Sequence, residues 1–492
     1  MHLNFIIYNT YHVILVLNKS SQPSFLLSII PIIALLTTLI GIIIVKGADA
    51  AQSISYLILL GAAFLSLTLS SIFCPQPSSK ILEGLKKSAT QILPAIPILI
   101  FIATVSATWM LSGVVPTLID YGLSVINPQL FLFIACAVCS VISVLSGSSW
   151  STIATIGIAF QGIGNVMGYS DGWIAGAIIS GAYFGDKVSP LSDTTVLASS
   201  SCKVKLFTHI KYLMLTSSPA MILALLTYAG IGLFASATEA SQSLEIITAL
   251  QSSFNITPWV LIIPVVTGIL IAMRVKTYIS LAISSLLGLI GIFVFQPQII
   301  SALGYTSSWS DITIMCGDVL FTETAISTGN ELLDSLVGTG GVARMMPTIY
   351  LVLCAMIFGG TLIGTGMLGT ITQTFTNKIH TLRQTVSATI GSGLFLNCCT
   401  GDQYLSILLG GNLFRNLYKK NNLEPRLLSR SLEDSISATS VLIPWNSCGV
   451  TQSTVLGVAT LTYLPYCIFN IASPLLSLLF AWTGYKIRIL KN

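Results

Sequence analysis

Long apolar windows recur along this chain, and they limit its fold more than any other feature. A run of roughly 20 apolar residues can cross a bilayer as a helix, because a helix satisfies its own backbone hydrogen bonds in lipid. The composition agrees, since 53% of residues are hydrophobic and only 8% are charged. We therefore expect an all-α polytopic membrane protein. The predicted spans are residues 25–45, 54–73, 90–111, 206–234, 258–273, 278–295, 347–367 and 461–482.

The basic residues predict how these spans are oriented, because Lys and Arg collect in cytoplasmic loops. The net charge of +5 fits such an orientation signal better than nucleic-acid binding. Lys46 would lie outside and is an exception. The loops alternate between the inside and the outside along the whole chain only if residues 128–167 and 384–414 each enter the membrane and return to the same side. Basic loops expected inside contain Lys80, Lys86, Lys87, Lys203, Lys205, Arg274, Lys276, Lys378, Arg383, residues 415–430 and residues 486–491, and acidic loops expected outside are residues 235–257 and 296–346.

Both of these returning segments have a small, polar tip inside an apolar run. The first tip spans residues 146–151 and the second spans residues 397–403. Non-helical backbone at membrane depth is tolerated only where protein or a water-filled cavity satisfies it. We predict two re-entrant hairpins whose tips meet broken helices. The alternative is that each segment is an ordinary pair of short spans with a polar turn outside.

Two further segments read as helices interrupted within the membrane. The first is Gly185-Asp186-Lys187-Val188-Ser189-Pro190-Leu191-Ser192-Asp193-Thr194-Thr195, which follows an apolar run. Proline lacks an amide hydrogen and breaks a helix, which frees carbonyls that can join carboxylates and hydroxyls as ligands for a small cation. The second covers residues 431–459 and is interrupted at residues 444–449. For the first segment, a surface loop between two spans is the alternative.

Carboxylates at these positions are candidates for an ion pathway, because ionisable residues are costly inside a membrane. Asp402 lies at a hairpin tip far in sequence from any basic residue. Asp434 either lies on an ion pathway or caps a helix that begins near Ser431. Lys187 either pairs with a carboxylate at depth or stands in for a cation in the proton-loaded state.

The order of these elements predicts an internal repeat. Three spans, a hairpin, a broken helix and a final span occur in residues 25–234 and again in residues 258–484, and the two series begin on opposite sides. This arrangement predicts two inverted-topology repeats, each with a re-entrant hairpin and a discontinuous helix, with substrate near the bilayer midplane. Residues 1–24 form an N-terminal segment of uncertain structure, residues 235–257 an outer connecting loop and residues 485–492 a cytoplasmic tail.

Motifs of other protein classes are not found in the sequence. The N-terminal segment has no basic n-region or small-residue cleavage site, which argues against a cleaved signal peptide. The pair Cys136 and Cys139 lies in an apolar run with no histidine nearby, so we expect no bound metal. No phosphate-binding Gly-rich loop and no His-Glu-x-x-His pattern occurs, and we expect neither a cofactor nor an enzyme.

The motifs together resemble the NhaC family of bacterial sodium/proton antiporters, over roughly residues 25–482. The resemblance implies secondary antiport in the bacterial inner membrane, within a larger ion-transporter superfamily, and some members exchange organic acids. This chain departs from the family pattern with Ser151 in the first tip and Gly401 before Asp402, which could mark a subfamily with another substrate. The matching segments are residues 185–195, residues 149–152 with 155–157, residues 401–404, residues 432–435 and residues 443–446.

From the motifs and this resemblance we expect sodium and protons to be exchanged by alternating access. Asp186 and Asp402 are the expected exchangeable carboxylates and the expected sodium site, where a proton or a sodium ion binds but seldom both. Asp193 and Asp434 are secondary candidates. The neutral oxygen ligands are expected to come from Ser149, Ser189, Thr194, Thr195 and Asn446.

The alternatives keep the same fold and change the substrate. A sodium- or proton-coupled organic acid exchanger of the malate/lactate type, or an amino-acid transporter, would use serine-rich tips to bind a carboxylate. A channel would need a continuous pore. The expected partners are membrane lipid, sodium ions and protons, with a homodimer as a further expectation and no nucleic acid.

Overall fold

The computed structural model describes residues 22–485 apart from 235–239, 307, 327–333, 335–336, 377–378 and 380. These residues fold almost entirely into helices, and the described part contains no strand beyond one isolated bridge between Thr324 and Thr339. The expectation of an all-α polytopic protein is confirmed. Seven described helices are long and apolar enough to cross a membrane, or up to nine if two bent pairs count as spans.

The predicted spans match these helices closely. The spans predicted at residues 258–273 and 461–482 belong to the two bent pairs, with bends of 86° and 58°. Five of the remaining predicted spans lie within single long helical stretches, and the stretch from Ser78 to Leu111 contains α4 and α5, which meet at Pro94. The span predicted at residues 347–367 runs three residues past the end of α19 at Gly364. The helices are α2 Phe25–Lys46, α3 Ala48–Phe73, α4 Ser78–Ile92, α5 Ala95–Leu111, α12 Leu206–Phe234, α14 Ile262–Ala272, α15 Thr277–Phe295, α19 Gly341–Gly364 and α26 Ile468–Thr483.

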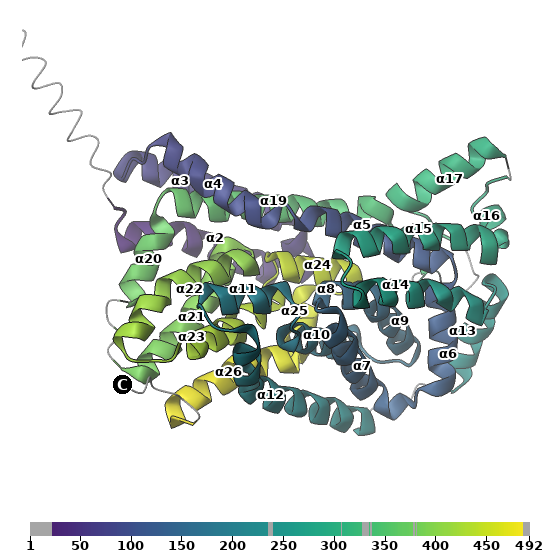
Figure 1. The fold of residues 1–492 in the computed structure, drawn as a ribbon. Helices are drawn as coiled ribbons and strands as arrows, with labels where there is room; N and C mark the ends of the chain where they lie inside the picture. The colour runs from purple at the N-terminus through teal and green to yellow at the C-terminus, as the bar shows by residue number, and fades with distance from the viewer. Residues whose placement is uncertain are drawn as a thin grey trace, which may run out of the picture.

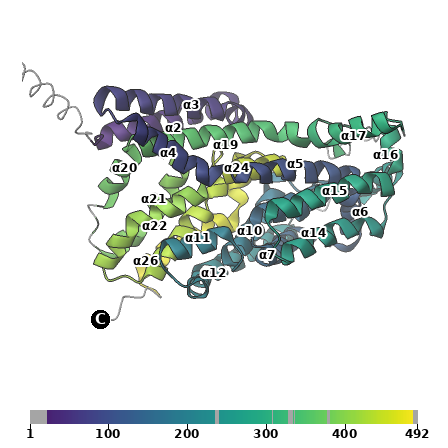
Figure 2. The same ribbon diagram turned by 45° about the horizontal axis from the view of Figure 1, so that its top comes forward.

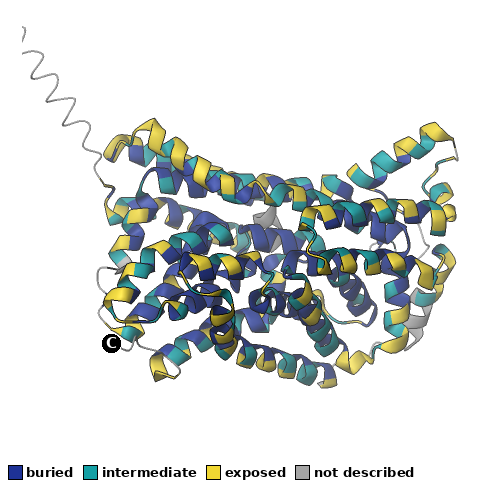
Figure 3. Cartoon of the chain, viewed as in Figure 1, coloured by how far each residue is buried: buried dark blue, intermediate teal, exposed yellow. Residues whose placement is uncertain are grey.

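The long helices pack side by side in three sets. Helix α19 packs on α3 and α4, α15 packs on α5, and α12 packs on α26. Figures 1 and 2 show α19 and α5 running along one side of the fold, with the hairpins and broken helices beside them. Figure 3 shows that the buried residues, in dark blue, concentrate in this interior. Shorter connecting helices are α6 Val114–Val125, α13 Ala240–Ser253, α16 Pro297–Ala302, α17 Trp309–Phe321 and α20 Met367–Thr376.

Both segments predicted as hairpins turn at a glycine followed by a helix cap. That they re-enter the membrane stays a prediction, since Pro128–Ser146 is long and apolar enough to cross it. In the first, α7 (Phe131–Ser146) ends at Gly147, and Ser148 caps α8 (Ser149–Thr152), which continues through η2 (Ile153–Gly157) and α9 (Ile158–Val166). In the second, α21 (Leu382–Thr400) ends at Gly401, and Asp402 caps α22 (Gln403–Lys420). The two glycines have φ values of 68° and 64°, a left-handed conformation that glycine adopts without steric cost.

Both predicted helix breaks are present and lie against the hairpin tips. Helix α10 (Asp171–Val188) stops before Pro190, and Ser192 caps α11 (Asp193–Ser201). In the second half, α23 (Pro425–Leu432) runs into the π-helical turn η4 (Glu433–Ser437) and the 3-10 turn η5 (Ser440–Leu442). The chain then breaks at Pro444, and Asn446 caps α24 (Ser447–Leu456). The remaining short turns are η1 Pro128–Leu130, η3 Pro258–Leu261, α25 Thr460–Tyr463 and η6 Leu464–Tyr466.

The start of the second broken helix differs from the expectation. We expected it near Ser431, but α23 begins at Pro425, where Glu424 occupies the cap position. The charged stretch around Arg426 resembles a cytoplasmic loop in sequence, yet proline at the first helical position is compatible with a helix start. Asp434 therefore lies beyond α23, in the π-helical turn that follows it, and the interpretation of Asp434 as a helix cap is wrong.

The two halves share the order of hairpin and broken helix, with a glycine at each tip and a proline at each break. Their inverted orientation stays a prediction, as do the domain boundaries at residues 25–234 and 258–484. The predicted connecting loop at residues 235–257 contains α13. Most of the predicted N-terminal segment, residues 1–21, and most of the predicted tail, residues 486–492, lie outside the described residues.

Candidate ion-binding site

The first hairpin tip holds the carboxylate of Asp186. The backbone N–H of Ser149 donates to Oδ2 of Asp186 at 3.1 Å, and the Ser149 hydroxyl donates to the same oxygen at 2.7 Å. Ser149 opens the short helix α8, so this carboxylate also lies at a helix N-terminus, where the backbone dipoles favour negative charge. The hydroxyl of Ser189 donates to the carbonyl of Val144 at 2.8 Å, which ties the break to the hairpin.

The second hairpin tip holds the carboxylate of Asp402 in a related way. The backbone N–H of Leu405 donates to Oδ1 at 2.8 Å, and the hydroxyl of Ser447 donates to Oδ2 at 3.3 Å. The Ser447 N–H also donates to the carbonyl of Gly401 at 2.8 Å. Each tip therefore meets the break of its own half, and each contact contains one carboxylate and one serine hydroxyl. The carboxylate lies on the broken helix in the first half and on the hairpin in the second.

A cavity of about 730 Å³ reaches both tips. Its lining includes Asp186 and Asp193 from the first broken helix and Gln403 and Tyr404 from the second tip. Tyr404 interacts electrostatically with Asp186, Asp193 and Asp402, so it lies between the two carboxylate sites. No hydrogen bond among the described residues joins Asp186 to Asp402 directly. The structure thus brings the two predicted carboxylates to one region without placing them in contact.

Other predicted ligands divide into cavity-lining and structural residues. Asp193 and Thr194 line the cavity. The hydroxyl of Thr195 donates to the carbonyl of Lys187 at 2.9 Å and so closes the break. Asn446 caps α24 by accepting from the N–H of Cys448 at 3.1 Å, and its amide nitrogen donates to the carbonyl of Asn397 at 3.3 Å. Thr195 and Asn446 therefore position the breaks in this conformation.

A buried ionic cluster lies behind the cavity. The Nζ of Lys187 pairs with Oδ1 of Asp434 at 2.5 Å, and both side chains are almost fully buried. The hydroxyl of Thr216 donates to both oxygens of Asp434 at 3.0 Å, and Ser473 contacts both Lys187 and Asp434. Lys187 therefore pairs with a carboxylate at depth, as one of our two interpretations expected. In this arrangement Asp434 is the counter-ion of Lys187.

Arg430 and Glu433 lie beside the same pair. Glu433 belongs to the matched segment 432–435 but was not among the expected site residues, and Arg430 was expected in a cytoplasmic loop. We expected residues 415–430 to form a cytoplasmic basic loop, but Arg430 is completely buried. Its guanidinium lies over the rings of Tyr212 and Phe480, and its Nε is 3.8 Å from Oδ2 of Asp434. The spacing of four residues between Arg430 and Asp434 is a helical pairing pattern that could have indicated this.

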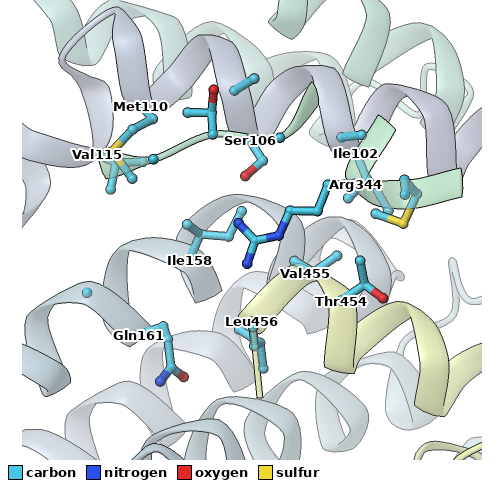
Figure 4. Close-up of a pocket in the computed structure, with 18 of the residues that line it drawn as sticks. Ile102, Ser106, Met110, Val115, Ile158, Gln161, Arg344, Thr454, Val455 and Leu456 are labelled. Atoms are coloured by element: carbon cyan, nitrogen blue, oxygen red, sulfur yellow. The ribbon is translucent and has the colours of Figure 1, made fainter. Parts of the chain in front are cut away.

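A second cavity lies apart from the first and shares no lining residue with it. It has a volume of about 240 Å³, and the side chain of Arg344 extends into it beside Ile158 and Thr454 (Figure 4). Helix α5 lines both cavities, the first with residues up to Ile98 and the second from Ile102 onward. Figure 4 also shows Gln161 on the opposite wall from Arg344.

In the described part of the chain, no three His, Cys, Asp or Glu side chains gather closely enough to hold a structural metal. Cys136 and Cys139 are buried free thiols. The carboxylates and hydroxyls of the hairpin tips are hard oxygen donors, which suit an alkali cation as cargo.

Carboxylates at the tips of membrane hairpins, facing a cavity within a many-helix fold, are the features of an ion-coupled membrane transporter. Residues 181–485 match the Na+/H+ antiporter family. The chain belongs to this family and is a multi-pass protein of the bacterial inner membrane.

Individual relatives differ in their named substrates. The chain is 36% identical over 407 residues to the Na+/H+ antiporter NhaC of Alkalihalophilus pseudofirmus, covering 82% of this chain and 84% of that protein. It is 32% identical over 471 residues to a malate-2H+/Na+-lactate antiporter of Bacillus subtilis, covering 93% and 97%. A solved structure of Neisseria gonorrhoeae MtrF aligns over 88% of this chain and 95% of that chain with a TM-score of 0.37 and 14% identity, too weak a likeness to carry an argument.

Proposed function

We propose that the protein exchanges sodium ions for protons across the bacterial inner membrane by alternating access. The observation that carries this proposal is the carboxylate of Asp186, held by two donors of Ser149 where a hairpin tip meets a broken helix. The carboxylate lines a cavity, so a cation from water can reach it. The family and its NhaC relative support sodium and protons as the exchanged ions.

Sodium binds at Asp186 with help from the hydroxyls around it. A serine hydroxyl that donates to a carboxylate can rotate and offer its lone pairs to a cation instead. Ser149 and Thr194 are the hydroxyls placed for this at the first tip. Asp402 and Ser447 form the corresponding pair at the second tip. A proton on either carboxylate removes the charge that attracts sodium, so the two loads exclude each other.

Two separate cavities support alternating access over a channel. The larger cavity has Arg274 and Lys276 at its lining, on a loop that the basic-residue pattern predicts to be cytoplasmic. The smaller cavity includes Arg344, which lies in the segment predicted to be outside. Since the two cavities share no lining residue, the tips between them would have to move relative to α5 to expose a bound ion first to one side and then to the other.

Sodium-driven proton movement in proteoliposomes tests the proposal. In wild type, a sodium gradient should dissipate an imposed pH gradient, while Asp186→Asn and Asp402→Asn should each lower the rate at least tenfold. Asp311→Asn on α17 is the matched control, because the Asp311 carboxylate accepts from Thr306 and lies outside both cavities. Full sodium-driven exchange in both Asn variants would remove these carboxylates from the site.

A second candidate function is exchange of organic acids, because the larger cavity far exceeds a sodium ion. Pockets of roughly 300–1,000 Å³ hold small organic ligands, and this cavity has about 730 Å³. Arg274 and Lys276 in its lining could attract a carboxylate. The malate/lactate relative supports this candidate. Labelled malate and lactate, added to the same proteoliposomes, distinguish the two functions: a sodium effect that requires an organic acid favours the second.

The surroundings of the protein are part of the proposal. We infer that lipid covers the exposed apolar side chains of the outer helices, such as Ile44 on α2 and Leu226 on α12. The predicted homodimer is checked by native mass spectrometry of the protein released from detergent.

A further inference from the structure

The carboxylate of Glu433 is completely buried, and the proposed sodium site does not use it. It lies in the π-helical turn η4, next to the ionic cluster. Neither of its oxygens makes a well-formed hydrogen bond, and no nitrogen of a described Lys, Arg or His lies within ion-pair distance. Ser437 is close enough to interact with it, but the Ser437 hydroxyl also lacks a well-formed bond.

An ionised carboxylate buried without donors is strongly disfavoured, since burying an unpaired charge costs several kcal/mol even after relaxation. These surroundings therefore favour the protonated form of the Glu433 carboxyl group. Glu433 is nevertheless close to Asp186, because α10 packs against η4, and Lys187, the residue after Asp186, pairs with Asp434, the residue after Glu433. The carboxyl group of Glu433 is thus placed to respond to a charge that arrives at Asp186.

The helices that pack against η4 are α10, α11, α21, α22, α23 and α26. Helix α21 meets it through Asn397, which donates to the carbonyl of Ile436, and α26 through Asn470, which donates to the carbonyl of Ala438. The turn η5 brings no ionisable residue. The charged and titratable groups around Glu433 are Asp186 and Lys187 on α10, Cys202 next to α11, His209 and Tyr212 on α12, Arg415 and Tyr418 on α22, Arg430 on α23 and Asp434 within η4 itself.

The charges of the ionic cluster and of the neighbouring, partly exposed Asp186 balance when Glu433 is protonated, if Arg415, which is also partly exposed, is left to the solvent. Lys187 and Arg430 are the cations, Asp186 and Asp434 are the anions, and His209 is counted as neutral because its Nε2 is buried without a partner. A sodium ion at Asp186 would add one positive charge to this cluster. Ionisation of Glu433 would remove that excess. Because interactions between charges are strong in a medium of low dielectric constant, the two events favour each other.

We propose that Glu433 carries the exchanged proton, and that sodium at Asp186 expels it. The proton leaves the carboxyl oxygen and is released to water, and the remaining carboxylate offsets the charge of the sodium ion. Return of the proton to Glu433 restores the excess positive charge and lowers the affinity for sodium. This inference rests on the proposed function and replaces direct competition at Asp186 with exclusion between two neighbouring sites.

The pH dependence of sodium binding separates these two mechanisms. In purified wild type, calorimetry should show the sodium Kd falling about tenfold per unit rise in pH, because each bound sodium releases one proton. Glu433→Gln fixes the cluster in the proton-loaded charge state. We expect weak sodium binding in this variant and a change in Kd of less than about twofold per pH unit. Direct competition at Asp186 would leave the tenfold slope in place.

Glu424→Gln is the matched control, since Glu424 pairs with Arg426 near the surface and should leave the slope unchanged. A tenfold slope in Glu433→Gln would overturn the inference while leaving the proposed function standing. Absence of sodium binding in wild type would instead overturn the proposed function.

A measurement on wild type covers the case in which Glu433→Gln does not fold. Dicyclohexylcarbodiimide modifies protonated carboxyl groups in apolar surroundings, and mass spectrometry locates the product. Glu433 should be modified in potassium buffer and protected in sodium buffer of equal strength. An unmodified Glu433 in potassium, or equal modification in both buffers, would overturn the inference.

Discussion

At the scale of single residues, one serine and one ion pair define the chemistry of the core. Ser149 supplies two of the donors that hold Asp186, and Lys187, the next residue, points to Asp434 instead. The adjacent positions of Asp186 and Lys187 thus serve different neighbours. The last turn of α10, which ends at Val188, thus places the carboxylate of Asp186 on the cavity and the ammonium group of Lys187 in the interior.

Ser149→Ala should weaken sodium binding without removing it. The substitution deletes the hydroxyl and keeps the backbone N–H that also reaches Asp186. A hydrogen bond to a charged group contributes about 1.5–3 kcal/mol, so the KM for sodium should rise by roughly tenfold or more. Exchange rates in proteoliposomes over a range of sodium concentrations measure this. Ser200→Ala is the control, because its hydroxyl bonds only to the carbonyl of Leu197. An unchanged KM in Ser149→Ala would contradict the role of Ser149 at the site.

Breaking the pair of Lys187 and Asp434 should destabilise the fold more in single variants than in the double variant. Removing one partner leaves an uncompensated buried charge, which costs about 3–5 kcal/mol. The double variant Lys187→Met with Asp434→Asn removes both charges of the pair and leaves only Arg430 without its neighbouring carboxylate. Thermal unfolding in detergent should therefore give the lowest midpoints for the single variants. Losses that simply add in the double variant would show that the two groups are not coupled.

At the scale of elements, the hairpin tips and the helix breaks could be predicted from the sequence. The place of Arg430 in the buried ionic cluster could not. Gly147, Gly401, Pro190 and Pro444 interrupt apolar runs with residues that turn or end helices, and local chemistry determines that result. The burial of Arg430 depends on rings supplied by α12 and α26, which are distant in sequence. A pattern of nearby charges predicted a loop there, because the sequence does not show which helix covers it.

Gly147→Ala should disrupt the first tip. Any side chain at a φ of 68° is strained by roughly 1–2 kcal/mol, and the added Cβ would lie 2.7 Å from the backbone carbon of Leu191 in the break. We expect sodium-driven exchange to fall at least tenfold while the protein still inserts. Gly230→Ala in α12 is the matched control, since its Cβ would meet nothing within 4 Å. Equal activity in the two variants would show that the tip tolerates a side chain and does not need this close approach.

At the scale of the whole molecule, the two cavities and α5 describe one state of a carrier. The larger cavity is lined by Asp186 and reaches the second tip at Gln403 and Tyr404. The smaller one is lined by Arg344 on α19 and by Thr454 near the end of α24. Helix α24 begins at the break that holds Asp402, so its ten residues span about 15 Å between the second tip and the smaller cavity. A movement of the tips against α5 would therefore change both cavities together.

Cysteines introduced at Thr90 and Thr454 should report this movement in opposite directions. Thr90 lines the larger cavity and Thr454 the smaller one. In proteoliposomes at rest, a membrane-impermeant maleimide should label Thr90→Cys faster than Thr454→Cys, because Thr90 is exposed and Thr454 is only partly exposed. Conditions that drive exchange should slow labelling at the first position and speed it at the second. Wild type supplies the background from its native thiols, most of which are buried. Parallel changes at both positions would contradict alternating access, since a single moving barrier cannot open both cavities at once.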